Sequence, residues 1–320
     1  MAGVHCRICT QPIPPPPLRV REMMFGLEES FDYHLCPHCQ CLQIGTIPGD
    51  LSPYYPPGYY SYAPVPQPGS APFQRLRRLR DRATAAGRSP WQRLLRRLAP
   101  SATLADLSPL DLHESMAVLE LGCGSGARLH ALAACGFTRL LGIDPFLPSG
   151  LEQTGPVTLR RTSLAEVSGV FHLIMLHHTF EHLPDPRDTL AQIARRLHPG
   201  GWCLIRIPVV PSLAWHRYRE HWAQLDAPRH LHLFSTRSMQ ILARDSGLTL
   251  ERVRYDSGSF QFWASEQYAR GIPLQHPDSW SRGNRSLFSP ADMRRFRRLA
   301  RHCNRRGEGD QAVFSLRRPG

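Results

Sequence analysis

A glycine-rich loop and a carboxylate downstream of it are the residues whose spacing most clearly indicates chemistry. Gly122, Gly124 and Gly126 alternate with other residues directly after an apolar run, and Glu120 lies at the end of that run. Glycines at every second position let the backbone pass close to a bound ligand. Asp144 ends the next apolar run, where an acid can accept both hydroxyls of a ribose. The acid before the loop would repel a phosphate and attract an amine, so the pattern favours a ribose-containing cation over a dinucleotide.

Histidines and a glutamate follow a later apolar run, FHLIML at 171–176. Ligands of open α/β sheets bind beyond the carboxyl ends of the strands, where His177, His178, Glu181 and His182 are expected. A histidine with a near-neutral pKa can remove a hydroxyl proton there, and we expect His178 and His182 to be the catalytic candidates. The alternative is that these histidines bond to loop backbone or cap the next helix.

Two Cys-x-x-Cys pairs lie within the first 41 residues and predict a metal site. The four thiols, Cys6, Cys9, Cys36 and Cys39, have the spacing of a closed tetrahedral zinc site of the ribbon type. Zinc would then supply folding energy to a segment too short to bury its own core. His38 or Cys41 is close enough to replace one ligand, and disulfide pairing is a further alternative.

A polar and aromatic stretch at 215–234 predicts a substrate lid. Candidate substrate contacts within it are Trp222, Asp226, Arg229 and His230. Arginines in such a lid clamp phosphate or carboxylate groups, and compact domains rarely keep long irregular insertions without use. The alternative is a solvated loop whose aromatic side chains pack on the core.

The elements that must position these residues alternate between strand-like and helical patterns from 116 to 207. Helices are expected at 127–135 and after Pro186, between apolar runs that read as strands. This alternation predicts an α/β, Rossmann-like, doubly wound and mostly parallel seven-stranded sheet. The runs at 248–256 and 311–318 add a C-terminal antiparallel hairpin, and a small N-terminal zinc ribbon precedes the sheet.

The chain is expected to divide into four parts. These are a zinc-ribbon-like unit at 1–44, a Pro/Tyr-rich connector at 45–72, basic amphipathic helices at 73–112, and a catalytic domain at 113–320 with its lid at about 211–240. Segments 73–99 and 294–306 carry the whole positive excess. We expect the helices in both to bury an apolar stripe and leave their arginines in water. A surface that contacts anionic lipid is the alternative for 73–99.

The net charge is +13, and every basic residue is arginine because the sequence contains no lysine. This excludes Schiff-base chemistry and the Walker A phosphate loop, which both need a lysine amine. The sequence has no apolar run of about twenty residues and no signal-peptide pattern at its start, so we expect a cytoplasmic protein.

Four ordered motifs resemble class I S-adenosylmethionine-dependent methyltransferases, in the branch with ubiquinone and sugar methyltransferases. They are VLELGCGSG (118–126), LLGIDP (140–145), FHLIMLHHTFEHLPDP (171–186) and LHPGGWCLIRIP (197–208). The resemblance implies S-adenosylmethionine as cofactor. It assigns the methionine part to Glu120 and the loop, the ribose to Asp144, and the adenine to the neighbourhood of Ser163 and Leu164. The implied cofactor set is Glu120, Gly122, Cys123, Gly124, Gly126, Asp144, Pro145, Ser163, Leu164 and His177. Thr162 and Ser163 stand where the family often has an acid beside the adenine, and His172 replaces a frequent aspartate.

The expected activity is methyl transfer to a small-molecule, sugar or lipid-linked polysaccharide-precursor acceptor. The alternative is an RNA methyltransferase or a zinc-containing RNA-binding protein. Its arginine-rich helices would neutralise the phosphates of the RNA. Against it, His178-Thr179-Phe180-Glu181 stands where amino-directed nucleic-acid methyltransferases carry Asn/Asp-Pro-Pro-aromatic. A protein that binds the cofactor without turnover is a third reading. The sequence leaves open whether oxygen, nitrogen or carbon is methylated.

Overall fold

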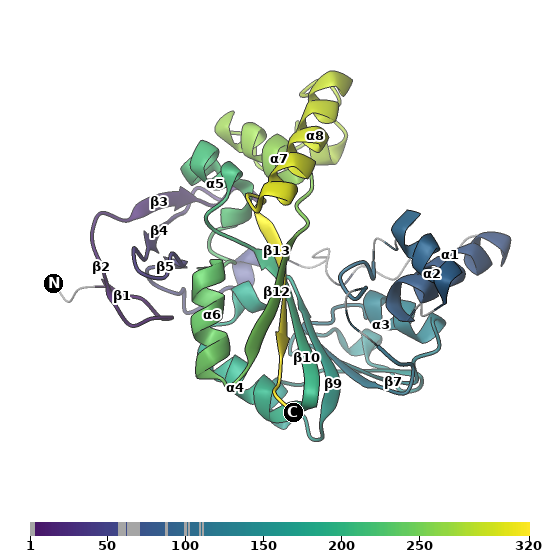
Figure 1. Ribbon diagram of the computed structural model, residues 1–320. Helices are drawn as coiled ribbons and strands as arrows, with labels where there is room; N and C mark the ends of the chain where they lie inside the picture. The colour runs from purple at the N-terminus through teal and green to yellow at the C-terminus, as the bar shows by residue number, and fades with distance from the viewer. Residues whose placement is uncertain are drawn as a thin grey trace. The chain divides into compact units, whose positions relative to one another are not determined.

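The computed structural model describes residues 4–56, 62, 71–86, 89–98, 101, 103–108, 110 and 112–320 (Figure 1). Of the predicted connector at 45–72, residues 57–61 and 63–70 lie outside the described residues. The chain divides into two compact units, each discontinuous in sequence. Unit 1 contains 1–56, 178–191 and 205–317, and unit 2 contains 57–177, 192–204 and 318–320.

The main sheet has seven strands in the order β12-β13-β10-β9-β6-β7-β8. Its strands are β6 (Ala117–Leu121), β7 (Arg139–Ile143), β8 (Val157–Arg160), β9 (Phe171–His177), β10 (Leu197–Pro208), β12 (Thr249–Tyr255) and β13 (Gln311–Arg317). Strand β6 pairs in parallel with β7 and β9, β7 pairs in parallel with β8, and β12 pairs antiparallel with β13. The predicted fold class, including the C-terminal hairpin, is confirmed. Within this main sheet, β8 is the strand that lies on a segment for which the sequence predicted no strand.

Unit 2 contains the buried strand β6 and the helices that precede and follow it in the chain. Helix α3 (Ala127–Ala134) follows β6, and α1 (Ala71–Ala86) and α2 (Pro90–Leu98) precede it in the chain. All five residues of β6 are buried, which is expected for a strand with neighbours on both sides. Helix α4 (Pro186–Arg196) begins at the predicted proline and leads into β10. The parallel register places Glu120 of β6 opposite Gly142 of β7 and Met175 of β9.

Unit 1 contains the cysteine-rich segment, which forms a hairpin of β1 (Val4–His5) with β2 (Pro12–Ile13) and a second sheet. That sheet has the order β11-β5-β4-β3, with β3 (Leu18–Arg21), β4 (Ser30–Leu35), β5 (Leu42–Ile44) and β11 (His232–Leu233). Strand β11 comes from the predicted lid, so the N-terminal segment completes its sheet with a strand from nearly 200 residues away. The two regions also share one apolar core that contains Tyr33, Leu42 and Trp215.

The remaining helices of unit 1 are α5 (Leu213–Tyr218), α6 (Thr236–Asp245), α7 (Phe260–Ala269) and α8 (Pro290–Arg306). Figure 1 shows α6 beside β12. Helix α8 begins with a capping box of Ser289 and Asp292 and buries Phe296 and Cys303 on one face. Short 3-10 helices are η1 (Ser52–Tyr54), η3 (Ser149–Leu151), η4 (Leu164–Glu166), η5 (Phe180–His182), η6 (Arg219–His221), η7 (Ala223–Leu225) and η8 (Trp280–Arg282).

The expectation that both groups of basic helices bury their apolar stripes is correct for α8 and wrong for α1 and α2. Five large apolar side chains of α1 and α2 are exposed: Leu76, Leu79, Trp91, Leu94 and Leu98. Helix α1 instead buries Asp81 and Thr84, whose hydroxyl accepts a hydrogen bond from the Ser101 amide at 2.9 Å. Helical periodicity defines an apolar face but cannot say whether another element covers it. None of the helices in the described ranges is long and apolar enough to cross a bilayer.

Candidate functional site

The glycine loop joins β6 to α3 through backbone conformations that favour glycine. Gly122, Gly124 and Gly126 have φ angles of 64°, 50° and 71°. A side chain at Gly126 would be strained by the positive φ angle, and its Cβ would lie 2.9 Å from a methyl carbon of Leu159, which would have to shift. The Gly122 amide donates to the Ile143 carbonyl at 2.8 Å, which ties the loop to the end of β7.

Asp144 lies directly after β7 and meets the loop as the sequence predicts. Its carboxylate accepts hydrogen bonds from the backbone amides of Phe146 at 2.9 Å and Gly124 at 3.3 Å. The Tyr62 hydroxyl donates to the same carboxylate at 3.5 Å. Burial raises the pKa of Asp144, and the hydrogen bonds oppose that rise. The structure therefore brings a hydroxyl donor, an acceptor carboxylate and the glycine loop together within unit 2.

Glu120 lies on the buried strand before the loop. Among the described residues its Oε2 atom has no hydrogen-bond partner, although the side chain is almost completely buried. Burial raises the pKa of Glu120 to about 7, against the opposing charge of Arg128. An orphaned, buried carboxylate oxygen is costly, and a bound cation with N–H donors would satisfy it.

Sequence reasoning missed two residues that lie near Glu120. They are Asp106 and Arg128. Arg128 donates to both carboxylate oxygens of Asp106, at 2.9 and 2.8 Å, and His177 Nε2 lies 2.5 Å from the same carboxylate. Burial disfavours the charge of Asp106, but His177 and Arg128 outweigh it and hold its pKa below the usual range. Arg128, two residues after the loop, was a visible signal in the sequence. Asp106 lies in a stretch without helical or strand periodicity, so nothing local marked it.

The other predicted cofactor residues differ in burial. Cys123 is buried within the loop, whereas Pro145 is exposed immediately after Asp144. Ser163 and Leu164 are half-buried at the start of η4. Ser163 forms a capping box with Glu166, and Thr162 also donates to Glu166. The acid that the family often carries beside the adenine is absent at 162–163. Glu166, three residues after Ser163, is hydrogen-bonded to both of these residues.

A cluster of three histidines surrounds Glu181 in unit 1. Glu181 has no exposed surface, and its Oε1 lies 3.3 Å from His178 Nδ1 and 3.9 Å from His230 Nε2. Burial opposes ionisation of Glu181, but the neighbouring histidines hold its pKa below the usual value. Ligand atoms of Glu181, His182 and His230 all lie within 4.8 Å of one another, a spacing that a metal ion accepts.

The hydrogen bonds distinguish the two predicted catalytic histidines. His182 Nδ1 lies 2.8 Å from the Arg229 carbonyl, which can only accept, so Nδ1 carries the proton and Nε2 keeps a lone pair. His178 Nε2 instead faces the Arg206 guanidinium at 2.8 Å, which can only donate. The lone pair on His178 Nε2 therefore accepts a hydrogen bond from Arg206. The lone pair on His182 Nε2 points away from the Arg229 carbonyl, which is bonded to Nδ1.

The four predicted substrate contacts are largely buried. The Trp222 ring nitrogen donates to Asp310 at 3.0 Å. The fully buried guanidinium of Arg229 is paired with Asp226 at 2.6 Å and Glu22 at 2.9 Å. His230 Nδ1 lies 2.8 Å from the carbonyl of residue 224, and burial lowers the pKa of this histidine to about 4. These partners give the residues a packing role, and their contact with substrate stays a prediction.

The four predicted zinc ligands converge in unit 1. Their sulfur atoms lie within 4.8 Å of one another, with Cys6 and Cys39 3.4 Å apart and Cys9 and Cys36 3.5 Å apart. The two pairs have the same turn: the amide one residue after each second cysteine donates to the carbonyl of the first, at 2.9 Å. Thr10 and Gln40 occupy these turn positions, with φ angles of 59° and 60°. Four converging thiols on two equivalent turns fit a tetrahedral zinc ion.

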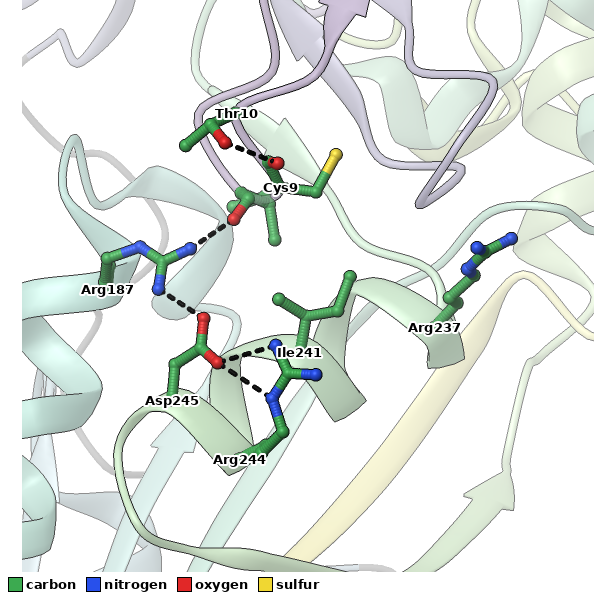
Figure 2. Close-up of a pocket in the computed structure, with 8 residues that line it drawn as sticks. Cys9, Thr10, Arg187, Arg237, Ile241, Arg244 and Asp245 are labelled. Atoms are coloured by element: carbon green, nitrogen blue, oxygen red, sulfur yellow. Dashed lines mark hydrogen bonds and ion pairs between the residues drawn. The ribbon is translucent and has the colours of Figure 1, made fainter.

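A cavity of about 600 Å³ lies beside the first cysteine turn in unit 1. Its lining comes from Ile8, Cys9, Thr10, Arg187, Arg237, Ile241, Arg244 and Asp245. Figure 2 shows Arg187 and Arg244 converging on Asp245, at 2.5 and 2.8 Å. Arg187 also donates to the Ile8 carbonyl. Two of the three arginines are therefore engaged within the protein, and this cavity contains none of the predicted catalytic residues.

Comparison with known proteins gives the family. Residues 86–253 match the family described as a methyltransferase domain, more than half of the 320-residue chain. The chain is 30% identical to a trans-aconitate 2-methyltransferase of Deinococcus radiodurans, over 37% of this chain and 48% of the relative. It is 28% identical to a ubiquinone biosynthesis O-methyltransferase of Burkholderia cenocepacia, over 31% and 50% respectively. A tRNA U34 carboxymethyltransferase of Hydrogenovibrio crunogenus is 28% identical, over 30% and 33%.

The chain belongs to this methyltransferase family, which confirms the family predicted from the motifs. Family membership also supports S-adenosylmethionine as the cofactor. The matches span half or less of each of these relatives, and the relatives differ in their acceptors. Similarity therefore leaves the acceptor open.

Proposed function

We propose that this protein transfers the methyl group of S-adenosylmethionine to a small-molecule acceptor, with sugars and lipid-linked polysaccharide precursors included in that class. The observation that carries the proposal is a buried Glu120 oxygen that has no hydrogen-bond partner in the described part of the chain, next to the glycine loop that Asp144 contacts. The cofactor has a cationic amine and a ribose, and these two groups match the two carboxylates in charge and hydrogen bonding.

Three features of the chain would hold the cofactor. Glu120 would accept from its amine, Asp144 would accept from the ribose hydroxyls, and the glycine loop would let the backbone approach. When bound, the cofactor would supply a methyl group activated by the positive charge of its sulfonium. The residues of the protein then have to orient the acceptor and exclude water, which accounts for most of the rate enhancement in such a reaction.

For a hydroxyl acceptor we propose His182 as the general base. The bond from Nδ1 to the Arg229 carbonyl fixes the tautomer, and no other described residue bonds to the lone pair of Nε2. The ionised carboxylate of Glu181 would stabilise the imidazolium that forms. His178, held by Arg206, would act as a positioning residue for Glu181.

We further propose that Cys6, Cys9, Cys36 and Cys39 hold a structural zinc ion. Four thiolates close the coordination sphere and leave no position for substrate, so the ion would contribute to folding. Because the cysteine-rich segment shares its sheet and core with residues 205–317, the metal would stabilise the whole of unit 1.

Calorimetry with S-adenosylmethionine and with its demethylated product tests the proposal. The zinc-loaded chain is expected to bind both. Transfer of a labelled methyl group to members of a panel of hydroxylated small molecules, including nucleotide sugars, would then identify the acceptor class. Absence of binding to either cofactor form would overturn the proposed function. Labelling of RNA in place of every small molecule would favour the alternative acceptor.

Cofactor affinity is expected to fall by about tenfold between pH 7.5 and pH 6. Burial raises the pKa of Glu120 to about 7, so acid protonates the carboxylate that would pair with the amine. Calorimetry across this range checks the prediction. In Glu120→Gln the affinity should be lower at pH 7.5 and almost independent of pH, and an unchanged pH slope in that variant would assign the effect to another group.

His182→Ala is expected to lower kcat for a hydroxyl acceptor by about 100-fold or more, with little change in cofactor affinity. His178→Ala is the matched control, because Arg206 engages its lone pair and we expect a smaller loss. Initial rates and calorimetry on both variants check this. A larger loss of kcat in the His178 variant would reverse the assignment of the base.

A further inference from the structure

Helices α1 and α2 of unit 2 expose a group of large apolar side chains. The exposed fractions are 62% for Leu76, 50% for Leu79, 55% for Trp91, 56% for Leu94 and 76% for Leu98. Figure 1 shows the two helices side by side, and they pack against each other. Single exposed apolar residues are ordinary, but a concentration on two adjoining helices usually marks an interaction surface.

The apolar residues are arranged by helical spacing. Trp91, Leu94 and Leu98 follow one another at intervals of three and four residues, which places them on one face of α2. Leu76 and Leu79 are likewise three residues apart in α1. The exposed leucines precede Asp81, Ala83 and Thr84 in α1, and these three later residues are buried.

The same two helices are strongly basic. Helix α1 contains five arginines and one acid, and α2 contains three arginines and no acid. The acid, Asp81, is buried and paired with Arg77 and Arg80, at 3.6 and 3.0 Å. Arg75 and Arg78 are exposed beside the leucines of α1. The described surface of these helices therefore combines apolar side chains with positive charge and carries no exposed carboxylate.

We propose that this surface, formed by Leu76, Leu79, Trp91, Leu94 and Leu98 with the arginines of α1, docks on an anionic lipid bilayer. A bilayer surface offers an apolar layer for leucine and tryptophan directly below a layer of phosphates for guanidinium groups. Tryptophan is favoured at that boundary. Nucleic acid has the phosphates but no apolar layer, so it leaves the exposed leucines unexplained.

Helix α8 supports the proposal because it is also rich in arginine but differs from α1 and α2 in the burial of its apolar side chains. It contains seven arginines in seventeen residues, yet it buries Met293, Phe296, Ala300 and Cys303. Arginine content alone therefore does not expose an apolar stripe in this protein. The difference makes α8 a matched control, because its charge can be changed without touching an exposed apolar face.

Co-sedimentation of the full chain with phosphatidylcholine vesicles containing about 30% phosphatidylglycerol tests the proposal. We expect binding that weakens with salt and is absent with pure phosphatidylcholine. The triple variant Trp91→Ser, Leu94→Ser, Leu98→Ser should lose binding by about tenfold or more. The variant Arg298→Gln, Arg301→Gln in α8 removes two exposed charges and should bind like the wild type.

Calorimetry with the demethylated cofactor and circular dichroism establish that each variant is folded. Both should match the wild type, since none of the altered residues belongs to the cofactor site. Three results would overturn the proposal: no vesicle binding by the wild type, full binding by the α2 variant, or a loss in the α8 variant as large as in the α2 variant. Binding of an RNA oligonucleotide without vesicle binding would assign the surface to nucleic acid instead.

Discussion

Replacing Asp144 with alanine is expected to weaken the binding of S-adenosylmethionine by about 100-fold. The proposed contacts are two charge-assisted hydrogen bonds to the ribose hydroxyls, each contributing about 1.5–3 kcal/mol. The buried carboxylate also accepts from the amides of Gly124 and Phe146, so the substitution additionally loosens the loop that approaches the cofactor. Calorimetry with the cofactor and its demethylated product measures the loss.

Asp144→Asn separates these two effects, because the amide oxygen can still accept from the backbone while the charge is gone. We expect its affinity to lie between those of the wild type and the alanine variant. Asp278→Ala, which removes an exposed acid, should bind like the wild type. Wild-type affinity in Asp144→Ala, with a normal thermal transition, would show that the ribose is held elsewhere.

Loss of the metal is expected to destabilise unit 1 severely. Cys39→Ser removes one of four converging thiols and should abolish stoichiometric zinc binding, with a cost of roughly 3 kcal/mol or more in the free energy of unfolding. The effect should extend beyond the first 44 residues, because β11 pairs with β5 and Tyr33 donates to the His230 carbonyl at 2.8 Å. Metal analysis of the purified chain and thermal unfolding check this.

Cys41→Ser is the control for the zinc prediction. Cys41 is buried in the same segment but lies outside the four-thiol cluster. Its variant should retain one zinc ion per chain, with only a packing loss. Equal loss of zinc in both variants would indicate that Cys41 replaces one of the proposed ligands. A wild-type chain that is fully folded without any metal would contradict the structural role of zinc.

Local patterns were sufficient for the sheet and for the residues at its strand ends. The apolar runs, the glycine loop and the acids Glu120 and Asp144 lie within 28 residues of each other, and parallel pairing of β6 with β7 follows from their alternation with α3. The same holds for the two cysteine pairs, because each turn is built from four consecutive residues. Helix α8 was predictable to its first residue, since Ser289 and Asp292 form the capping box within a single turn.

Contacts between distant parts of the chain were not predictable in this way. Asp106 meets His177 across 71 residues, and Arg229 meets Glu22 across 207. Periodicity does not indicate which acid a given arginine will reach. The sequence therefore suggested a substrate contact for Arg229 and did not predict its buried ion pairs with Asp226 and Glu22. The same limit applied to the two histidines predicted to be catalytic, whose tautomers depend on Arg206 and on the Arg229 carbonyl.

The sequence by itself therefore determined the alternation of strands and helices from β6 to β10 apart from β8, the glycine loop, the two acids and the cysteine turns. Each of these depends on residues within a few turns of one another. Tertiary structure alone decided which charges are desolvated, which histidine lone pair is free and whether the stripes of α1 and α2 are covered. Those properties depend on the neighbours that packing supplies, because desolvation and burial are set by all surrounding atoms and not by position in the chain.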